Sequence, residues 1–119
     1  MGRLDGVDAE TVLGLLVDDS IREALRLVDG QALSVKELAD RCDVSGPTMY
    51  RKVNELEELD LLEAETRIDP NGNHVTVFRN NVDRIDVSVE PSEGDVVVDI
   101  VRRHSADRFK DLWSGLKEQ

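Results

Sequence analysis

Ten consecutive residues, Ser45 to Asn54, combine two cations with several hydrogen-bond donors and contain no acidic residue. The chain around them is strongly acidic, with a formal net charge of −11 at pH 7. Cations and donors on one short segment suit contacts to the phosphates and base edges of a nucleic acid, where a carboxylate would be repelled. This segment is therefore the first candidate for a binding surface.

If the segment is a helix whose core face carries Met49, Val53 and Leu56, a turn of about 100° per residue places a polar set on the outer face. Arg51 is the candidate for reading a base, because its guanidinium matches the O6 and N7 atoms of guanine, and Asn54 suits adenine or a phosphate. The other polar side chains are predicted to contact phosphates. The full candidate set is Lys36, Ser45, Pro47, Thr48, Tyr50, Arg51, Lys52 and Asn54. The alternative is a solvated helix face.

To act on DNA, these side chains need a helix that a second helix holds in place. The sequence predicts such a pair over 34–58, with a capping box of Ser34 and Glu37 at the start of the first helix. Ser45 is placed to cap the second helix, with Pro47 in its first turn. Two short helices joined by a tight turn define a helix-turn-helix.

Two more helices are predicted ahead of this pair. Over 8–18, apolar residues cover more of the circumference than one core-facing stripe requires, so Val12 and Leu16 are expected to meet a second subunit. A helix over 20–28 follows, with Ser20 and Glu23 at capping-box spacing.

Residues 61–80 are predicted to form a two-stranded wing, because two strand-like runs flank the turn-forming segment DPNGN. Its polar side chains are candidates for contacts to phosphates or the minor groove. These residues are Arg67, Asn71, Asn73, His74 and Arg79. The alternative is that the asparagines serve the turn alone, since hairpin turns favour asparagine and glycine for backbone reasons.

Residues 84–102 are predicted to form a second hairpin, since apolar and polar residues alternate before the segment PSEG and a valine-rich run follows it. The competing interpretation is one long helix from Glu93 to Lys117, which the valine run and Gly94 disfavour. A helix over 105–117 is predicted to complete the subunit interface, with Trp113 as its anchor. The alternative is that Trp113 covers the core of its own chain. The apolar residues of that helix are Phe109, Leu112, Trp113 and Leu116.

Composition predicts a single domain over residues 1–119, with 39% apolar residues for a modest core. No apolar run approaches the roughly 20 residues of a membrane span, and the N-terminus has no apolar export segment. A cytoplasmic protein without membrane contact is therefore expected. Of fifteen basic residues only four are lysine, and fifteen of twenty-six acids are aspartate, a balance that suits work in high salt.

The sequence gives little support for catalysis or for metal binding. Cys42 is the single cysteine, so no disulfide within the chain and no cysteine-based zinc site is possible. It is expected to be a small buried hydrophobe, with a redox-sensing thiol as the alternative. His104 beside Asp107 is better explained as a solvated charge cluster than as a metal site. No cofactor, no metal and no enzymatic activity are predicted.

The segment SVKELADRCDVSGPTMYRKVNELEELDLLEAE, within residues 17–79, resembles the ArsR-type winged helix-turn-helix transcriptional regulators. Leu38 and Ala39 stand where the first helix touches the second, and Asp43 stands where the family usually has a glycine. Aspartate can take that place because it tolerates left-handed backbone. The acidity, the extra hairpin and the terminal helix make the whole chain similar to the forms found in halophilic archaea, including regulators of their oxidative-stress response. The cysteine pair of the family's metal sensors is missing.

The prediction is thus an α+β winged helix-turn-helix with N-terminal and C-terminal dimerisation helices and an extra β-hairpin. The resemblance implies a homodimer on a pseudo-palindromic operator in double-stranded DNA, with the helix over 45–58 in the major groove. The alternative is a winged-helix module that binds proteins in a transcription complex and does not read DNA.

Overall fold

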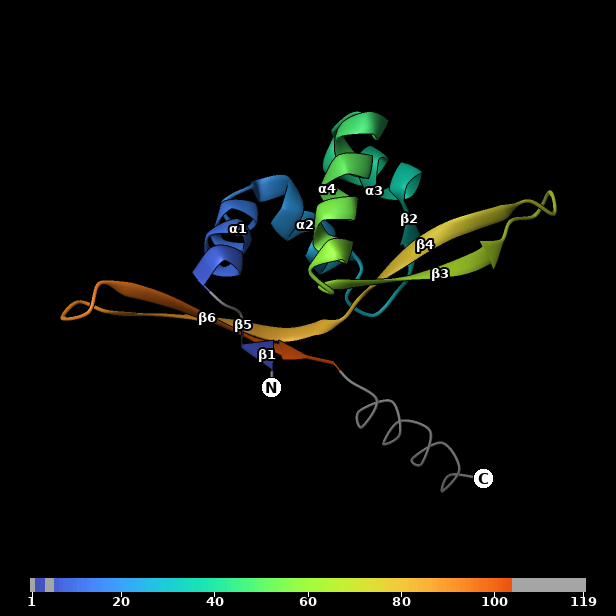
Figure 1. The fold of residues 1–119 in the computed structure, drawn as a ribbon. Helices are drawn as coiled ribbons and strands as arrows, with labels where there is room; N and C mark the ends of the chain where they lie inside the picture. Colours follow the sequence, from blue (N-terminus) through green and yellow to red (C-terminus); the bar gives the residue numbers. More distant parts are fainter. Residues whose placement is uncertain (1, 4–5, 104–119) are drawn as a thin grey trace, which may run out of the picture.

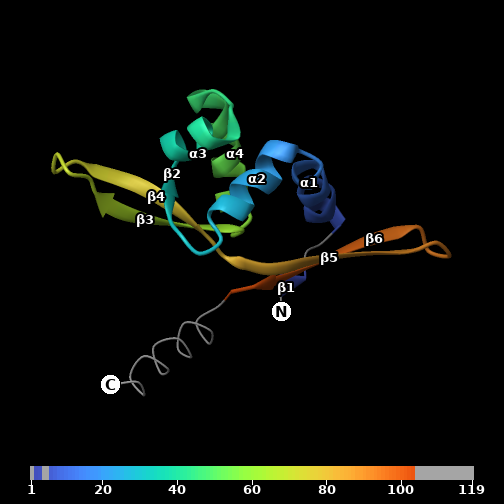
Figure 2. The same ribbon diagram turned by 180° about the vertical axis from the view of Figure 1, so that it is seen from behind.

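The computed structural model describes residues 2–3 and 6–103, which form an α+β fold of four helices and two antiparallel sheets (Figure 1). Both views show the helices together on one side of a long ribbon made by the last four strands (Figures 1 and 2). The elements are β1 (Gly2–Arg3), α1 (Gly6–Leu16), α2 (Asp19–Leu27), β2 (Leu33–Ser34), α3 (Val35–Cys42), α4 (Gly46–Glu58), β3 (Leu62–Ile68), β4 (His74–Asn80), β5 (Val82–Glu90) and β6 (Asp95–Arg102).

The pair α3 and α4 is set by three local signals. Ser34 Oγ accepts the N–H of Glu37 at 3.1 Å while the Glu37 carboxylate accepts the N–H of Ser34 at 2.9 Å, which is the predicted capping box. Asp43 ends α3 in the left-handed region, with φ 55° and ψ 47°. Ser45 Oγ caps α4 by accepting the N–H of Thr48 at 3.3 Å. These three predictions are confirmed.

The predicted cap of α2 is wrong. Asp18, not Ser20, is the N-cap: its carboxylate accepts the backbone N–H of Ser20 at 2.8 Å. Glu23 is used instead by Arg26 one turn later, in an exposed ion pair. Asp18 and Ser20 both suit an N-cap, so the spacing to Glu23 was not a sufficient guide.

The two hairpins form one continuous ribbon. In the first sheet β4 lies between β2 and β3, and in the second β6 lies between β1 and β5. Only Asn81 separates β4 from β5, so the wing (β3 and β4) and the second hairpin (β5 and β6) extend in opposite directions beneath the helices (Figure 1). Residues 95–102 are a strand, which rules out the competing long helix over that stretch.

The core lies between the helices and the ribbon. Met49, Val53 and Leu56 of α4 are fully buried, as predicted, beside Leu38 of α3. At the other end, α1 packs on β6, where Val98 and Ile100 of the strand are also fully buried. Each helix therefore buries an apolar stripe against its neighbours and the ribbon.

The structure contradicts the prediction that Val12 of α1 lies at a subunit interface. Val12, assigned to the subunit interface, has no exposed surface, because it belongs to the core between α1 and β6. Leu16 is half-buried against the same core. Leu13 is also half-buried against this core, while Val17, the residue after α1, is 77% exposed. Phe109, Leu112, Trp113 and Leu116 lie outside the described residues.

A polar junction joins the helices to the two hairpins. Asn80 is 8% exposed, and its Nδ2 donates to Asp29 Oδ1 at 3.1 Å and to the Val82 carbonyl at 2.6 Å. Its Oδ1 accepts the N–H of Val82 at 3.0 Å. Arg103 donates to the same Asp29 at 2.9 Å. One buried amide thus fixes the point at which the wing becomes the second hairpin.

Replacing Asn80 with alanine is expected to lower the free energy of unfolding by about 1–3 kcal/mol, because it leaves buried polar groups of Val82 without their partner. Asn81→Ala is the matched control: Asn81 is half-exposed and its side chain makes one hydrogen bond, to the Asp60 carbonyl at 3.0 Å. Urea denaturation of both variants measures the difference. Equal losses for the two variants would contradict the assigned role of Asn80.

None of the helices in the described part of the chain is long and apolar enough to cross a membrane.

Candidate nucleic-acid interface

The first half of α4 presents an exposed surface without carboxylates. Pro47, Tyr50 and Arg51 are exposed, and Tyr50 keeps 60% of its surface accessible. The first acid along the helix is Glu55. The N–H groups at the start of the helix add a partial positive charge to this end. The surface therefore has the hydrogen-bond donors and the charge that a phosphate backbone attracts.

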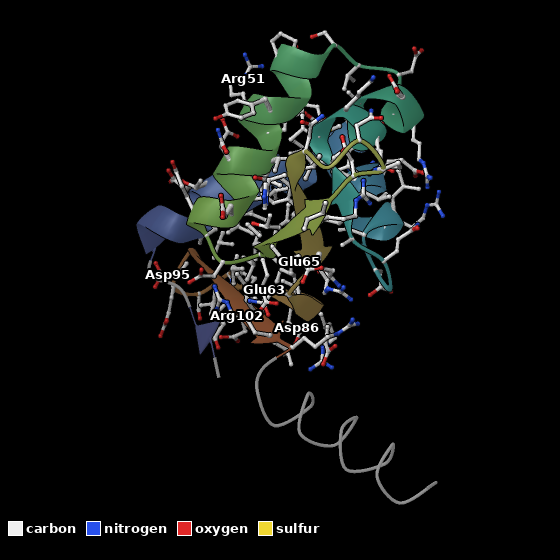
Figure 3. All side chains as sticks on the ribbon, turned by 90° about the vertical axis from the view of Figure 1, so that its right-hand side faces the viewer. Arg51, Glu63, Glu65, Asp86, Asp95 and Arg102 are labelled. Carbon is white, nitrogen blue, oxygen red and sulfur yellow. The ribbon has the colours of Figure 1, made fainter. Side chains whose placement is uncertain are left out.

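Arg51 is the cation best placed to reach outward. Figure 3 shows it at the surface of α4, on the side turned away from α3, while the labelled carboxylates Glu63, Glu65, Asp86 and Asp95 all lie below it. Within residues 6–103, its guanidinium takes part in no hydrogen bond or ion pair of the structure. An exposed guanidinium without a carboxylate partner keeps its donors for a ligand.

Lys52, predicted to contact a phosphate, is committed inside the protein. Its Nζ forms an ion pair with Asp18 at the start of α2, and its side chain is only 16% exposed. The hydrogen bond from Lys52 holds the pKa of Asp18 below its usual value, and the backbone N–H groups of Ser20 and Ile21 act in the same direction. Asp18 therefore serves both as the cap of α2 and as the anion that draws Lys52 toward α2.

Asp18→Asn is expected to free Lys52 for DNA without loss of the cap, because asparagine caps helices as well as aspartate does. Partly exposed ion pairs are worth about 0.2–1 kcal/mol, so the expected gain in DNA affinity is roughly 1.5–5-fold. One added phosphate contact should also make the slope of log K against log salt more negative by about 0.9. Fluorescence anisotropy with one DNA fragment at several salt concentrations measures both quantities.

Asp95→Asn is the control for that experiment. Asp95 is exposed at the start of β6 on the second hairpin and has no ion pair with another described residue, so the substitution removes one negative charge away from α4 and releases no cation. An equal gain in both variants would show that charge alone, and not Lys52, changes the affinity. Lys52→Ala should abolish the gain when combined with Asp18→Asn.

Ser45 and Thr48, also predicted to contact phosphates, are first used within the helix cap. Ser45 Oγ and Thr48 Oγ1 lie 2.8 Å apart in a hydrogen bond, in addition to the backbone cap. Ser45 is exposed and Thr48 is half-buried. Since each hydroxyl oxygen has more than one bonding site, the pair keeps capacity for a phosphate at the start of α4.

A cleft separates α3 and α4 from the wing. Lys36, Tyr50 and Asn54 line its helical side, and Arg67 and Thr76 line the wing side. Four carboxylates also line it, those of Glu37, Asp40, Glu57 and Asp69. The candidate residues of the helices and of the wing therefore share one concave surface, but that surface is not uniformly basic.

Both arginines of the wing have carboxylate partners in the protein. Arg67 binds Glu37 at 2.9 Å, which ties β3 to the start of α3, and Arg79 binds Glu65 across the wing at 3.0 Å. The N–H of Ser34 and the guanidinium of Arg67 together lower the pKa of Glu37. The prediction did not foresee these pairs, which reduce the charge that either arginine offers to DNA.

The tip of the wing supports both interpretations of its asparagines. The carboxylate of Asp69 accepts the backbone N–H groups of Asn71 and Asn73, at 2.9 and 2.8 Å, and so shapes the turn. The side chains of Asn71, Asn73 and His74 are all exposed. The backbone therefore explains the turn, and the side chains stay accessible to a ligand.

Cys42 is half-buried, and its thiol lies 3.9 Å from the carbonyl oxygen of Ser20. Burial raises the pKa of this thiol, and the carboxylate of Glu23 raises it further. A raised pKa disfavours the reactive thiolate. The geometry is that of a packing residue, and no three His, Cys, Asp or Glu side chains among the described residues form a group that could hold a metal ion.

One comparison with known proteins agrees with this geometry. No curated protein sequence matches the chain. Residues 22–65, from α2 to the middle of β3, match a family model described as a helix-turn-helix domain. This part of the chain is therefore similar to a helix-turn-helix domain, in which α3 and α4 are the two helices joined by the tight turn.

Proposed function

We propose that the protein is a sequence-specific DNA-binding transcriptional regulator that acts as a homodimer, with α4 in the major groove. The observation that carries the proposal is the exposed, acid-free first half of α4, where Arg51 has no carboxylate partner among the described residues. In a helix-turn-helix, the second helix enters the major groove and its N-terminal residues reach the base edges. The match over residues 22–65 supports the same assignment.

The remaining contacts of the proposed complex follow from the cleft. Tyr50, Asn54 and Lys36 line it from the helical side and would meet the phosphates that flank the major groove. The wing tip, with Asn71, Asn73 and His74, would reach the next stretch of backbone or the minor groove. Arg67 and Arg79 would contribute less than their charge suggests, because Glu37 and Glu65 compete for them.

Selection from a pool of random duplex DNA tests the proposal and identifies the operator in the same experiment. We expect enrichment of a two-fold symmetric motif whose half-sites are separated by about one helical turn, 10–10.5 bp, or a multiple of it. An electrophoretic shift with the enriched motif should be displaced by the same unlabelled motif and not by a scrambled one. If folded protein enriches no motif, the regulator assignment fails and a module that binds other proteins takes its place.

We also propose that the protein works in the cytoplasm at high salt and takes part in an oxidative-stress response. The acidic, lysine-poor composition and the resemblance to regulators of halophilic archaea support these assignments. Cys42 is a poor sensor for such a response, because its thiol is half-buried and its pKa is raised. The response would then depend on another part of the protein or on a ligand.

A further inference from the structure

One face of the second hairpin is apolar along its whole length but is covered along only part of it. The cross-strand pairs Ile85 with Ile100, Val87 with Val98 and Val89 with Val96 alternate along the hairpin, so all six side chains share one face. Near the base, α1 covers this face and buries Val98 and Ile100. Toward the tip, Val87, Val89 and Val96 remain 47%, 56% and 37% exposed.

These three residues, which we name the valine face, continue the buried core out into solvent. They account for half of the large hydrophobic residues that are exposed in the described part of the chain. The hairpin extends beyond α1 at this point, and no other described element lies over it (Figures 1 and 2). A contiguous apolar face on a projecting hairpin is typical of an interaction surface.

The negative charge of this hairpin makes the same hairpin of another copy an unsuitable occupant of the valine face. The segment 82–95 holds five acids, Asp83, Asp86, Glu90, Glu93 and Asp95, and a single basic residue, Arg84. Two copies of this hairpin packed face to face would bring like charges together, at a cost that grows as water is excluded. A suitable occupant is apolar on one side and not acidic overall.

By its sequence, the C-terminal segment of the chain suits both conditions, because a helical spacing would place its large apolar residues on one side. Residues 104–119, outside the described part of the structure, carry the four apolar residues Phe109, Leu112, Trp113 and Leu116. Their three acids, Asp107, Asp111 and Glu118, are balanced by three basic residues, Arg108, Lys110 and Lys117. Sixteen residues extend to about 53–58 Å, or about 24 Å as a helix, and either length spans the hairpin.

The direction of β6 favours a segment from another copy. This strand runs from Asp95 at the hairpin tip to Arg102 at its base, so the chain leaves the hairpin heading away from the valine face. Residues 104–114 contain no glycine or proline, the residues that most readily reverse a chain. We propose that residues 104–119 of one protomer pack on the valine face of its partner, which defines the interface of the homodimer named under "Proposed function".

The first test uses Val89→Asp and Ser88→Asp, which place the same charge at adjacent exposed positions on opposite faces of β5. Sedimentation equilibrium should give twice the 13.3 kDa chain mass for the unmodified protein and for Ser88→Asp. For Val89→Asp the dimer dissociation constant should rise at least about tenfold, because the interface would bury an unpaired charge. A dimer insensitive to Val89→Asp would overturn the proposal. Leu112→Asp should weaken the dimer as Val89→Asp does, and an unaffected dimer would show that another segment occupies the face.

The second test identifies the occupant without relying on a destabilising charge. In a Cys42→Ser background, Val89→Cys together with Leu112→Cys should form a disulfide-linked dimer under mild oxidation, seen on a non-reducing gel. Ser88→Cys with Leu112→Cys should form little of it, because position 88 is on the other face. A disulfide confined to single chains would show that the segment covers its own hairpin and would overturn the exchange between protomers.

Neither test involves DNA, so the dimer and DNA binding can fail independently. An unmodified protein that is monomeric at micromolar concentration would remove the homodimer while leaving DNA binding by α4 intact. A dimer of the expected kind that enriches no DNA motif would do the reverse.

Discussion

Replacing Arg51 with alanine is expected to lower the affinity for the specific DNA motif roughly 5–150-fold per half-site, the range that follows from about 1–3 kcal/mol for a guanidinium bound to guanine. The physical reason is that Arg51 is exposed at the start of α4 and has no carboxylate partner among the described residues, so nothing in the folded protein competes for its donors. The same substitution should relax the preference at one base pair in each half-site. Competition binding with motifs that carry single base changes measures both effects.

Arg84→Ala is the control with the same loss of charge. Arg84 lies on the second hairpin, where it is bound to Asp86 at 2.8 Å, far from α4. If the two variants lose affinity equally, Arg51 acts only through the net charge and the assignment of α4 to the major groove is wrong. If Arg51→Ala weakens binding to every sequence equally, Arg51 contacts a phosphate and another residue reads the base.

The helix-turn-helix could be predicted from sequence because its determinants are local. The capping box of Ser34 and Glu37, the left-handed Asp43 and the cap by Ser45 each depend on residues a few positions apart. The spacing of Met49, Val53 and Leu56 is enough to orient α4, and that orientation places Arg51 outside. The positions of the candidate residues on α4 can therefore be predicted largely from the spacing of its buried residues.

The sequence could not predict which residues form ion pairs with one another. Lys52 is 34 positions from Asp18, and Arg67 is 30 positions from Glu37, so neither ion pair has a local signal. With twenty-six acids in the chain, almost any cation has many potential partners. Helical spacing placed Lys52 near the outer face, but only the packing of α2 beside α4 determines which carboxylate it meets.

The error at Val12 has a different origin. A helix with apolar residues around much of its circumference has two faces to bury, and the sequence does not say whether the second face meets another subunit or another part of the chain. In the structure, β6 takes that place. The sequence also predicts the second hairpin. Neither the pattern of the hairpin nor that of α1, however, indicates that the two pack together. Three of the exposed hydrophobic residues, Val87, Val89 and Val96, consequently lie on the hairpin, and Val17 after α1 is a fourth.

The affinity for DNA is expected to stay constant or to rise as potassium chloride is raised from about 0.3 M to about 2 M, a range in which the Debye length falls to a few ångströms or less. An ordinary basic protein with six to ten phosphate contacts would lose roughly 10³–10⁵ in affinity between 50 and 200 mM salt alone. Titrating one DNA fragment through this range and plotting log K against log salt gives the slope that separates the two cases.

The reason lies in the distribution of charge around the interface. Two chains of −11 give a dimer with a formal charge of −22, and its field repels DNA wherever screening is weak. Raising the salt from about 0.1 M to about 1 M shortens the Debye length from about 10 Å to about 3 Å, which removes this repulsion but leaves direct contacts of Arg51 and Asn54 largely intact. Few unpaired cations remain to release counterions, because Lys52, Arg67 and Arg79 are already held by carboxylates of the protein.

The cleft beside α4 adds a second effect of the same sign. Glu37, Asp40, Glu57 and Asp69 line it together with Tyr50 and Asn54, so carboxylates would face the phosphates when DNA binds. Such pairs of anions are tolerated only with cations between them, and an uptake of cations opposes the release that normally weakens binding in salt. Glu57→Gln combined with Asp69→Asn should therefore make the slope more negative, while a double amide substitution on the distant hairpin, Asp86→Asn with Asp95→Asn, should change it less. The number of phosphate contacts alone sets an expected slope of log K against log salt. If the unmodified protein shows a slope as steep as that, these carboxylates have no part in binding.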